Sequence, residues 1–66
     1  MLTFKKVLIG ELIAYRKRHK ITQSEFALKI GVAQQVISKF EKGEVEPRIT
    51  FIEKLVLGMG KELAIK

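Results

Sequence analysis

The chain has 66 residues, of which 47% are apolar and 30% are charged. This length and composition suit one small domain with a compact core, and the apolar fraction is too high for a disordered tail. Thirteen basic residues against seven acidic ones give a net charge of +6. This charge indicates a polyanionic partner, either nucleic acid or an anionic membrane surface. The alternative is that the basic residues only make the surface of the domain more soluble. The chain has no cysteine and one histidine, so disulfides, thiol catalysis and cysteine-bound metals are excluded, and we expect no enzyme activity, cofactor or metal.

The first predicted element is a helix over residues 4–19. Its apolar residues recur at helical spacing and predict one buried stripe, formed by Phe4, Leu8, Leu12 and Tyr15. Thr3 is available as the N-cap. No Gly or Pro separates Lys20 from the next element, so we expect a tight turn there.

Two shorter helices are predicted next, over residues 23–30 and 33–42. The first has the spacing of a capping box at its start, with Thr22 and Glu25, and it ends at a glycine that suits a left-handed C-terminal cap. The inward-facing residues of the two helices are Phe26, Ala27 and Ile30, then Ile37 and Phe40, with Val36 beside them. Gly43 ends the second of these helices.

A fourth helix is predicted over residues 49–59, after a loop in which Pro47 disfavours helix. Its inner stripe consists of Ile49, Ile52, Leu55, Val56 and Met59. Residues 61–66 alternate polar and apolar side chains, which is typical of a short strand with Leu63 and Ile65 on one face. A frayed tail is the alternative for this segment.

Residues 23–42 combine a short helix, a glycine turn and a second helix. Ala27 is small where the two helices approach, Gly31 allows a positive φ in the turn, and Ile37 packs the second helix on the first. This pattern resembles the helix-turn-helix of the lambdoid phage repressor and Cro superfamily, also called the xenobiotic-response-element family. The resemblance implies one all-α domain over residues 1–66, a compact four-helix lambda-repressor-like fold, here followed by a short C-terminal β-strand.

In that superfamily the third helix enters the major groove, so the resemblance implies that its outward residues read bases. These residues are Gln34, Gln35, Ser38 and Lys39. Glutamine can bond adenine N6 and N7, and lysine can donate to guanine O6 and N7. Phosphate contacts are implied for Gln23, Lys42 and Arg48, and less strongly for Ser24 and Lys29. For the four outward residues of the third helix, and for Ser24 and Lys29, the alternative is an ordinary solvated residue.

The resemblance carries two further expectations for this region. Arg16, late in the first helix, matches a residue that pairs with a glutamate late in the third, here Glu41. Gln23 matches a glutamine that also supports the first base-reading glutamine, here Gln34. Three residues depart from the superfamily pattern: Ala33 stands where Ser or Thr usually caps the reading helix, and Glu44 and Glu46 place negative charge in a loop that often carries basic or amide residues.

Three functions remain open from the sequence. The first is a dimeric repressor that binds double-stranded DNA at a palindromic operator, in which the terminal strand pairs with its copy as in HipB-like antitoxins. The dimer interface would consist of Leu63 and Ile65 with Phe51 and Leu57.

The second possible function is an antitoxin that neutralises a toxin protein and regulates its own operon. The third, membrane-surface binding, is disfavoured because the basic first helix needs its apolar stripe for the core. Without a membrane span or leader, a cytoplasmic location is expected.

Overall fold

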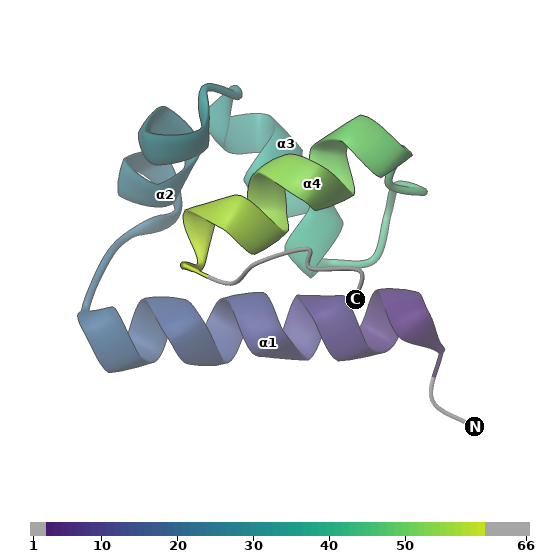
Figure 1. The fold of residues 1–66 in the computed structure, drawn as a ribbon, viewed down its shortest axis with the longest axis horizontal. Coiled ribbons are helices and arrows are strands. Elements are labelled where there is room, and N and C mark those ends of the chain that lie inside the picture. Colours follow the sequence, from purple (N-terminus) through teal and green to yellow (C-terminus); the bar gives the residue numbers. More distant parts are fainter. Residues whose placement is uncertain (1–2, 61–66) are drawn as a thin grey trace, which may run out of the picture.

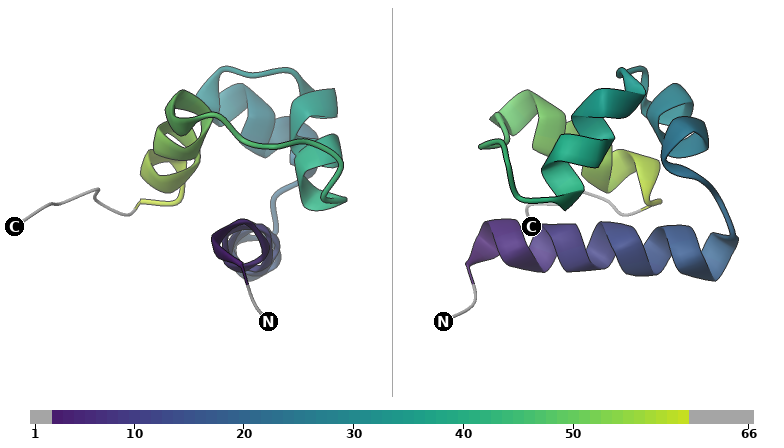
Figure 2. Two further views of the ribbon diagram at one scale, coloured as in Figure 1. Left: turned by 90° about the vertical axis from the view of Figure 1, so that its right-hand side faces the viewer. Right: turned by 180° about the vertical axis from the view of Figure 1, so that it is seen from behind.

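The structure, a computed structural model, describes residues 3–60, and these residues form four helices, as the sequence predicts. The helices are α1 (Phe4–His19), α2 (Gln23–Ile30), α3 (Gln34–Glu41) and α4 (Ile49–Gly58). The three shorter helices lie together on one side of the long α1 (Figures 1 and 2). In the part of the chain that the structure describes, no helix is long and apolar enough to span a membrane. The predicted strand, residues 61–66, lies outside the described residues.

The helix ends follow the local signals in the sequence. Thr3 caps α1 by accepting a hydrogen bond from the Lys6 backbone N–H at 3.2 Å. At α2 the capping box is complete, because the Glu25 N–H donates to Thr22 Oγ1 at 3.0 Å and the Thr22 N–H donates to Glu25 Oε1 at 2.7 Å. Gly31 ends α2 with a φ of 76°.

The boundaries of α3 and α4 differ slightly from the prediction. Ala33 is extended, with a ψ of 147°, so α3 begins one residue later than expected, and no side chain caps it. At its other end Lys42 is the cap residue rather than part of the helix. Helix α4 stops at Gly58 instead of Met59. Differences of one residue are normal where a helix end passes into a turn.

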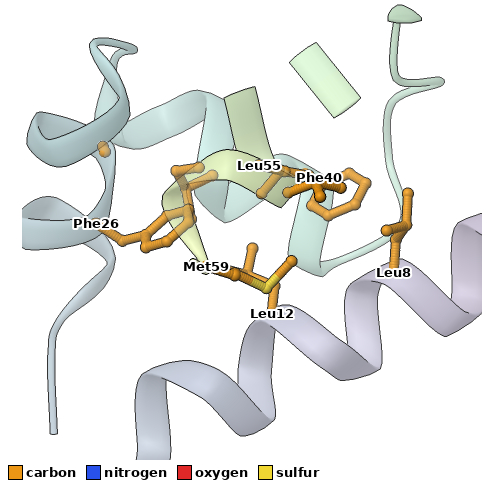
Figure 3. Close-up of a cluster of buried hydrophobic side chains, with 9 residues drawn as sticks. Leu8, Leu12, Phe26, Phe40, Leu55 and Met59 are labelled. Atoms are coloured by element: carbon orange, nitrogen blue, oxygen red, sulfur yellow. The ribbon is translucent and has the colours of Figure 1, made fainter. Parts of the chain in front are cut away.

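The core draws buried apolar side chains from α1, α2 and α3, and from α4 with the residue that follows it. The residues without exposed surface are Leu12, Phe26, Ile37, Phe40 and Leu55 (Figure 3). Leu8, Ala27, Val56 and Met59 complete the cluster. Among the described residues no polar or charged residue is fully buried. The polar contacts that position the functional surface therefore lie at the rim of the core.

Three predictions about the stripes were wrong. Phe4 is 66% exposed and Ile49 is 69% exposed, because each is the first residue of its helix and the core begins about one turn later. Phe51, expected off the inner stripe, is half-buried and packs its ring edge-to-face on Phe40, with 5.2 Å between ring centroids. Helical periodicity gives the direction of a side chain and not how far along the helix the core extends.

Two glycines offer a matched test of this packing. A Cβ atom on Gly58 would lie 2.3 Å from Cγ2 of Ile30 and 3.1 Å from Cζ of Phe26, whereas one on Gly10 would meet no atom within 4 Å. Gly58→Ala should therefore lower stability by about 1–3 kcal/mol through overpacking. Gly10→Ala should raise it by about 0.5–1 kcal/mol through helix propensity. Thermal denaturation followed by circular dichroism checks both, and a Gly58→Ala melting temperature at or above that of the native chain would contradict the packing.

Candidate nucleic-acid interface

The first residues of α2 and α3 meet at the helix-turn-helix. Gln23 opens α2 and Gln34 opens α3, and Gln34 Nε2 donates a hydrogen bond to Gln23 Oε1 at 2.8 Å. The turn brings these residues together because Gly31 and Val32 fold back onto α2, with the Val32 N–H donating to the Ala27 carbonyl at 3.0 Å. The contact expected from the superfamily resemblance is thus present, and it fixes the side chain of an exposed residue at the start of α3.

A hydrogen-bond network continues from Gln23 into the structure. Gln23 Nε2 donates to Glu41 Oε1 at 3.0 Å. Arg16 donates to both oxygens of the same carboxylate, from Nε to Oε2 and from Nη2 to Oε1, each at 2.7 Å. The two side chains of this ion pair are only 18% and 8% exposed. The structure therefore brings together Arg16 and Glu41, as expected, and adds a bond from Gln23 that the sequence did not predict.

Arg16 is strongly held in its charged form. The hydrogen bonds to Glu41 raise the pKa of the guanidinium above its usual value, partial burial opposes that rise, and the negative charge of Glu41 adds to it. Arg16 Nη1 also donates to the Ile21 carbonyl in the turn between α1 and α2, at 3.2 Å. One side chain thus joins α1, the first turn and α3.

The predicted base-reading residues occupy one surface of α3. Gln34, Gln35 and Lys39 are exposed, while Ser38 is partly buried. Gln35 and Lys39 line a groove of about 400 Å³, and Arg48, just before α4, lies on the same groove. The structure therefore places a predicted phosphate contact beside two predicted base contacts.

Val36 also lines this groove and is 38% exposed. The sequence predicts Val36 beside the inner-facing residues of α3, and its position on this groove was not predicted. Its position three residues before Lys39 puts both on the same side of α3, which is the signal that could have identified it. Val36 supplies an apolar surface of the kind that contacts a thymine methyl group.

Lys42, the cap residue at the end of α3, does not line this groove. It is exposed and lines a cavity of about 560 Å³ with the α1 residues Lys5 and Lys6. Lys5 Nζ donates to Glu46 Oε1 at 2.7 Å, so one of the two unexpected loop carboxylates is paired with a cation. Glu44 is exposed.

The remaining predicted site residues differ in exposure and in their contacts. Ser24 is exposed at the start of α2. Lys29 donates to the Tyr15 hydroxyl at 2.9 Å, which ties it to α1. Of the predicted dimer residues, Leu57 is 63% exposed, Phe51 is half-buried against Phe40, and Leu63 and Ile65 lie outside the described residues.

Helix α2, the turn and α3 have the arrangement of a helix-turn-helix protein. The exposed amide side chains lie at the start of α3, and a hydrogen bond to Gln23, which in turn bonds to Glu41, holds that end of the helix in place. A helix-turn-helix family model matches residues 12–65, and the chain belongs to this family, of the Cro and phage-repressor type. The resemblance drawn from the sequence is therefore confirmed.

Several curated proteins are similar to this chain. It is 38% identical over 58 residues to an uncharacterised HTH-type transcriptional regulator of Haemophilus influenzae, covering 88% of this chain and 59% of the relative. It is 35% identical to another such regulator from Methanocaldococcus jannaschii, over 82% of each chain. It is 31% identical to antitoxin HigA1 of Mycobacterium tuberculosis, covering 88% of this chain and 39% of the antitoxin. No solved structure matches the chain significantly.

The ion pair makes a direct prediction about stability. Glu41→Ala leaves Arg16 without its carboxylate and should cost roughly 3–5 kcal/mol, because a charge in a largely buried site loses its partner. Glu44→Ala, an acidic deletion three residues away on an exposed loop position, should change stability by less than about 0.5 kcal/mol. Urea denaturation of the two variants measures the difference, and equal midpoints would show that the pair does not stabilise the fold.

Proposed function

We propose that this protein is a sequence-specific, double-stranded DNA-binding transcriptional regulator that acts as a repressor, with α3 in the major groove. The observation that carries this proposal is the bond between Gln34 and Gln23. A long polar side chain at the surface usually loses conformational freedom when it binds. Here the side chain that would read the first base is already held, which favours a reading role over that of a solvated residue.

The roles of the other residues follow from their positions on the surface. Gln35 and Lys39 would contact base edges from the groove beside α3, with Val36 against a thymine methyl group and Ser38 a weaker reader because it is partly buried. Gln23 and Ser24, at the start of α2, would contact phosphate with the help of the free backbone N–H groups there. Lys42, at the end of α3, and Arg48, just before α4, would add phosphate contacts.

A pair of substitutions separates base reading from general affinity. Gln34→Ala should cost roughly 1–3 kcal/mol of binding and relax the preference at one base pair in each half-site. Lys42→Ala should weaken all sequences alike and reduce the slope of log affinity against log salt by about one unit. Selection from a random duplex library, followed by salt titrations, checks both. The assignment of Gln34 would be contradicted if the native chain and Gln34→Ala selected the same motif.

We further propose that the regulator is a homodimer with a palindromic operator. The exposed Leu57 on α4 and the apolar alternation of Leu63 and Ile65 support a shared interface near the end of the chain. A short strand in isolation is only marginally stable, and pairing with a second copy satisfies its backbone groups. Two-fold symmetry would place the reading helices one DNA turn apart, about 34–36 Å.

Removing residues 61–66 tests this interface. The shortened chain keeps every core residue of the four helices, so it should remain folded, but it should shift toward monomer and bind the operator much more weakly. Analytical ultracentrifugation at micromolar concentration gives the oligomeric state, and circular dichroism verifies the fold. A shortened chain that remains dimeric would show that the interface lies elsewhere. The surface of α4 around Phe51 and Leu57 would then be the next candidate.

The similarity to antitoxin HigA1 favours one second candidate, an antitoxin that neutralises a toxin protein and represses its own operon. This alternative keeps the same DNA-reading surface and adds a protein partner. An adjacent gene for a toxin, whose product is neutralised when the two chains are expressed together, would separate it from a repressor that acts alone.

A further inference from the structure

We infer that Glu41 is a positioning residue for DNA recognition: it determines which edge of the Gln34 amide faces the DNA and thereby favours adenine over guanine at that position. This inference rests on the proposed function of Gln34 as a base reader. It concerns a residue that lies at the far end of α3 from Gln34 and that is too buried to read bases itself. The connection runs through Gln23.

The first step is the contact between Glu41 and Arg16. Both carboxylate oxygens of Glu41 accept hydrogen bonds from the Arg16 guanidinium, each at 2.7 Å, and a carboxylate in such a pair offers only acceptors. Gln23 lies 3.0 Å from the same carboxylate and must therefore present its Nε2 group to it. A glutamine amide has a donor end and an acceptor end, so this contact also determines where the acceptor end of Gln23 points.

The second step carries that orientation to the reading helix. With its Nε2 on Glu41, Gln23 presents Oε1 to Gln34, and Gln34 Nε2 donates to it at 2.8 Å. Gln34 thus uses one of its two N–H groups inside the protein. Because Gln34 is exposed, its Oε1 and its second N–H remain available to DNA.

The third step is the match to the base. Adenine presents an acceptor, N7, beside a donor, N6, in the major groove, and this matches one N–H and one carbonyl oxygen of Gln34. Guanine presents two acceptors, N7 and O6, which match donors alone. If the amides of Gln23 and Gln34 were both reversed, Gln34 would accept from Gln23 and keep both N–H groups free for DNA, which also suits the two acceptors of guanine. Glu41 disfavours that reversed arrangement, because a carboxylate cannot donate to Gln23 Oε1.

The experiment compares Glu41→Gln with Arg16→Lys at pH 7.5. Glutamine at position 41 can donate as well as accept, so both amide arrangements become available to Gln23. Arg16→Lys weakens the same ion pair but leaves a charged carboxylate for Gln23, so it controls for lost stability. Selection with the native chain and with Gln34→Ala first identifies the base pair that Gln34 reads, and affinities are then measured for adenine and guanine at that position.

The native chain should prefer adenine by about tenfold or more, as expected of a bidentate contact. Arg16→Lys should keep that ratio even if its melting temperature falls, and Glu41→Gln should reduce it to about threefold or less, a loss of most of the discrimination of one such contact. An unchanged ratio in Glu41→Gln, or an equal loss in both variants, would overturn the inference. If the native chain selects no motif, the proposed function fails first.

A second variant keeps the test decisive if Glu41→Gln does not fold. Gln23→Ala leaves both bonds between Arg16 and Glu41 in place while removing the link to Gln34. It should lower the preference for adenine as Glu41→Gln does. A Gln23→Ala chain that retains the full tenfold preference would show that Gln34 needs no orientation from within the protein, and would overturn the inference by itself.

Discussion

The ion pair between Arg16 and Glu41 is the interaction on which the rest of the structure depends. It joins the end of α1, the longest helix, to the end of α3, 25 residues away in sequence. Arg16 also holds the turn before α2 through the Ile21 carbonyl, and Glu41 accepts a bond from the first residue of α2. A chain of this size buries a smaller fraction of its surface than a larger domain does. A few polar contacts at the rim of its core therefore fix angles between helices that a larger core would fix by packing.

Local features of this fold could be read from the sequence. Thr3, the pair Thr22 and Glu25, and Gly31 act within one or two turns of the positions they cap, so their spacing alone predicts helix ends that the structure confirms. Lys20 gave no such signal. It adopts a left-handed conformation with a φ of 56°, which lysine rarely takes, because the tight turn to α2 requires it there.

Contacts between distant residues were harder to predict. The pairing of Arg16 with Glu41, and the support of Gln34 by Gln23, came from the resemblance to a family and not from spacing. The bond from Gln23 to Glu41 and the pair between Lys5 and Glu46 were not expected at all, because each depends on how helices lie in space. Val36 was missed because it was assigned beside the inner residues of α3, although its spacing from Lys39 places the two on one side of that helix.

Helix α3 is held at both ends and in its middle, and this constrains its rotation. Ile37 and Phe40 lie fully buried in the core, which sets the face of α3 that points inward. Gln34 at the first residue and Glu41 at the last are both bonded to side chains of other helices. Rotation of α3 about its axis would break these bonds and expose apolar surface at once. The surface that carries Gln35 and Lys39 is therefore presented at a fixed angle, as a protein requires if it is to recognise bases by the geometry of short hydrogen bonds.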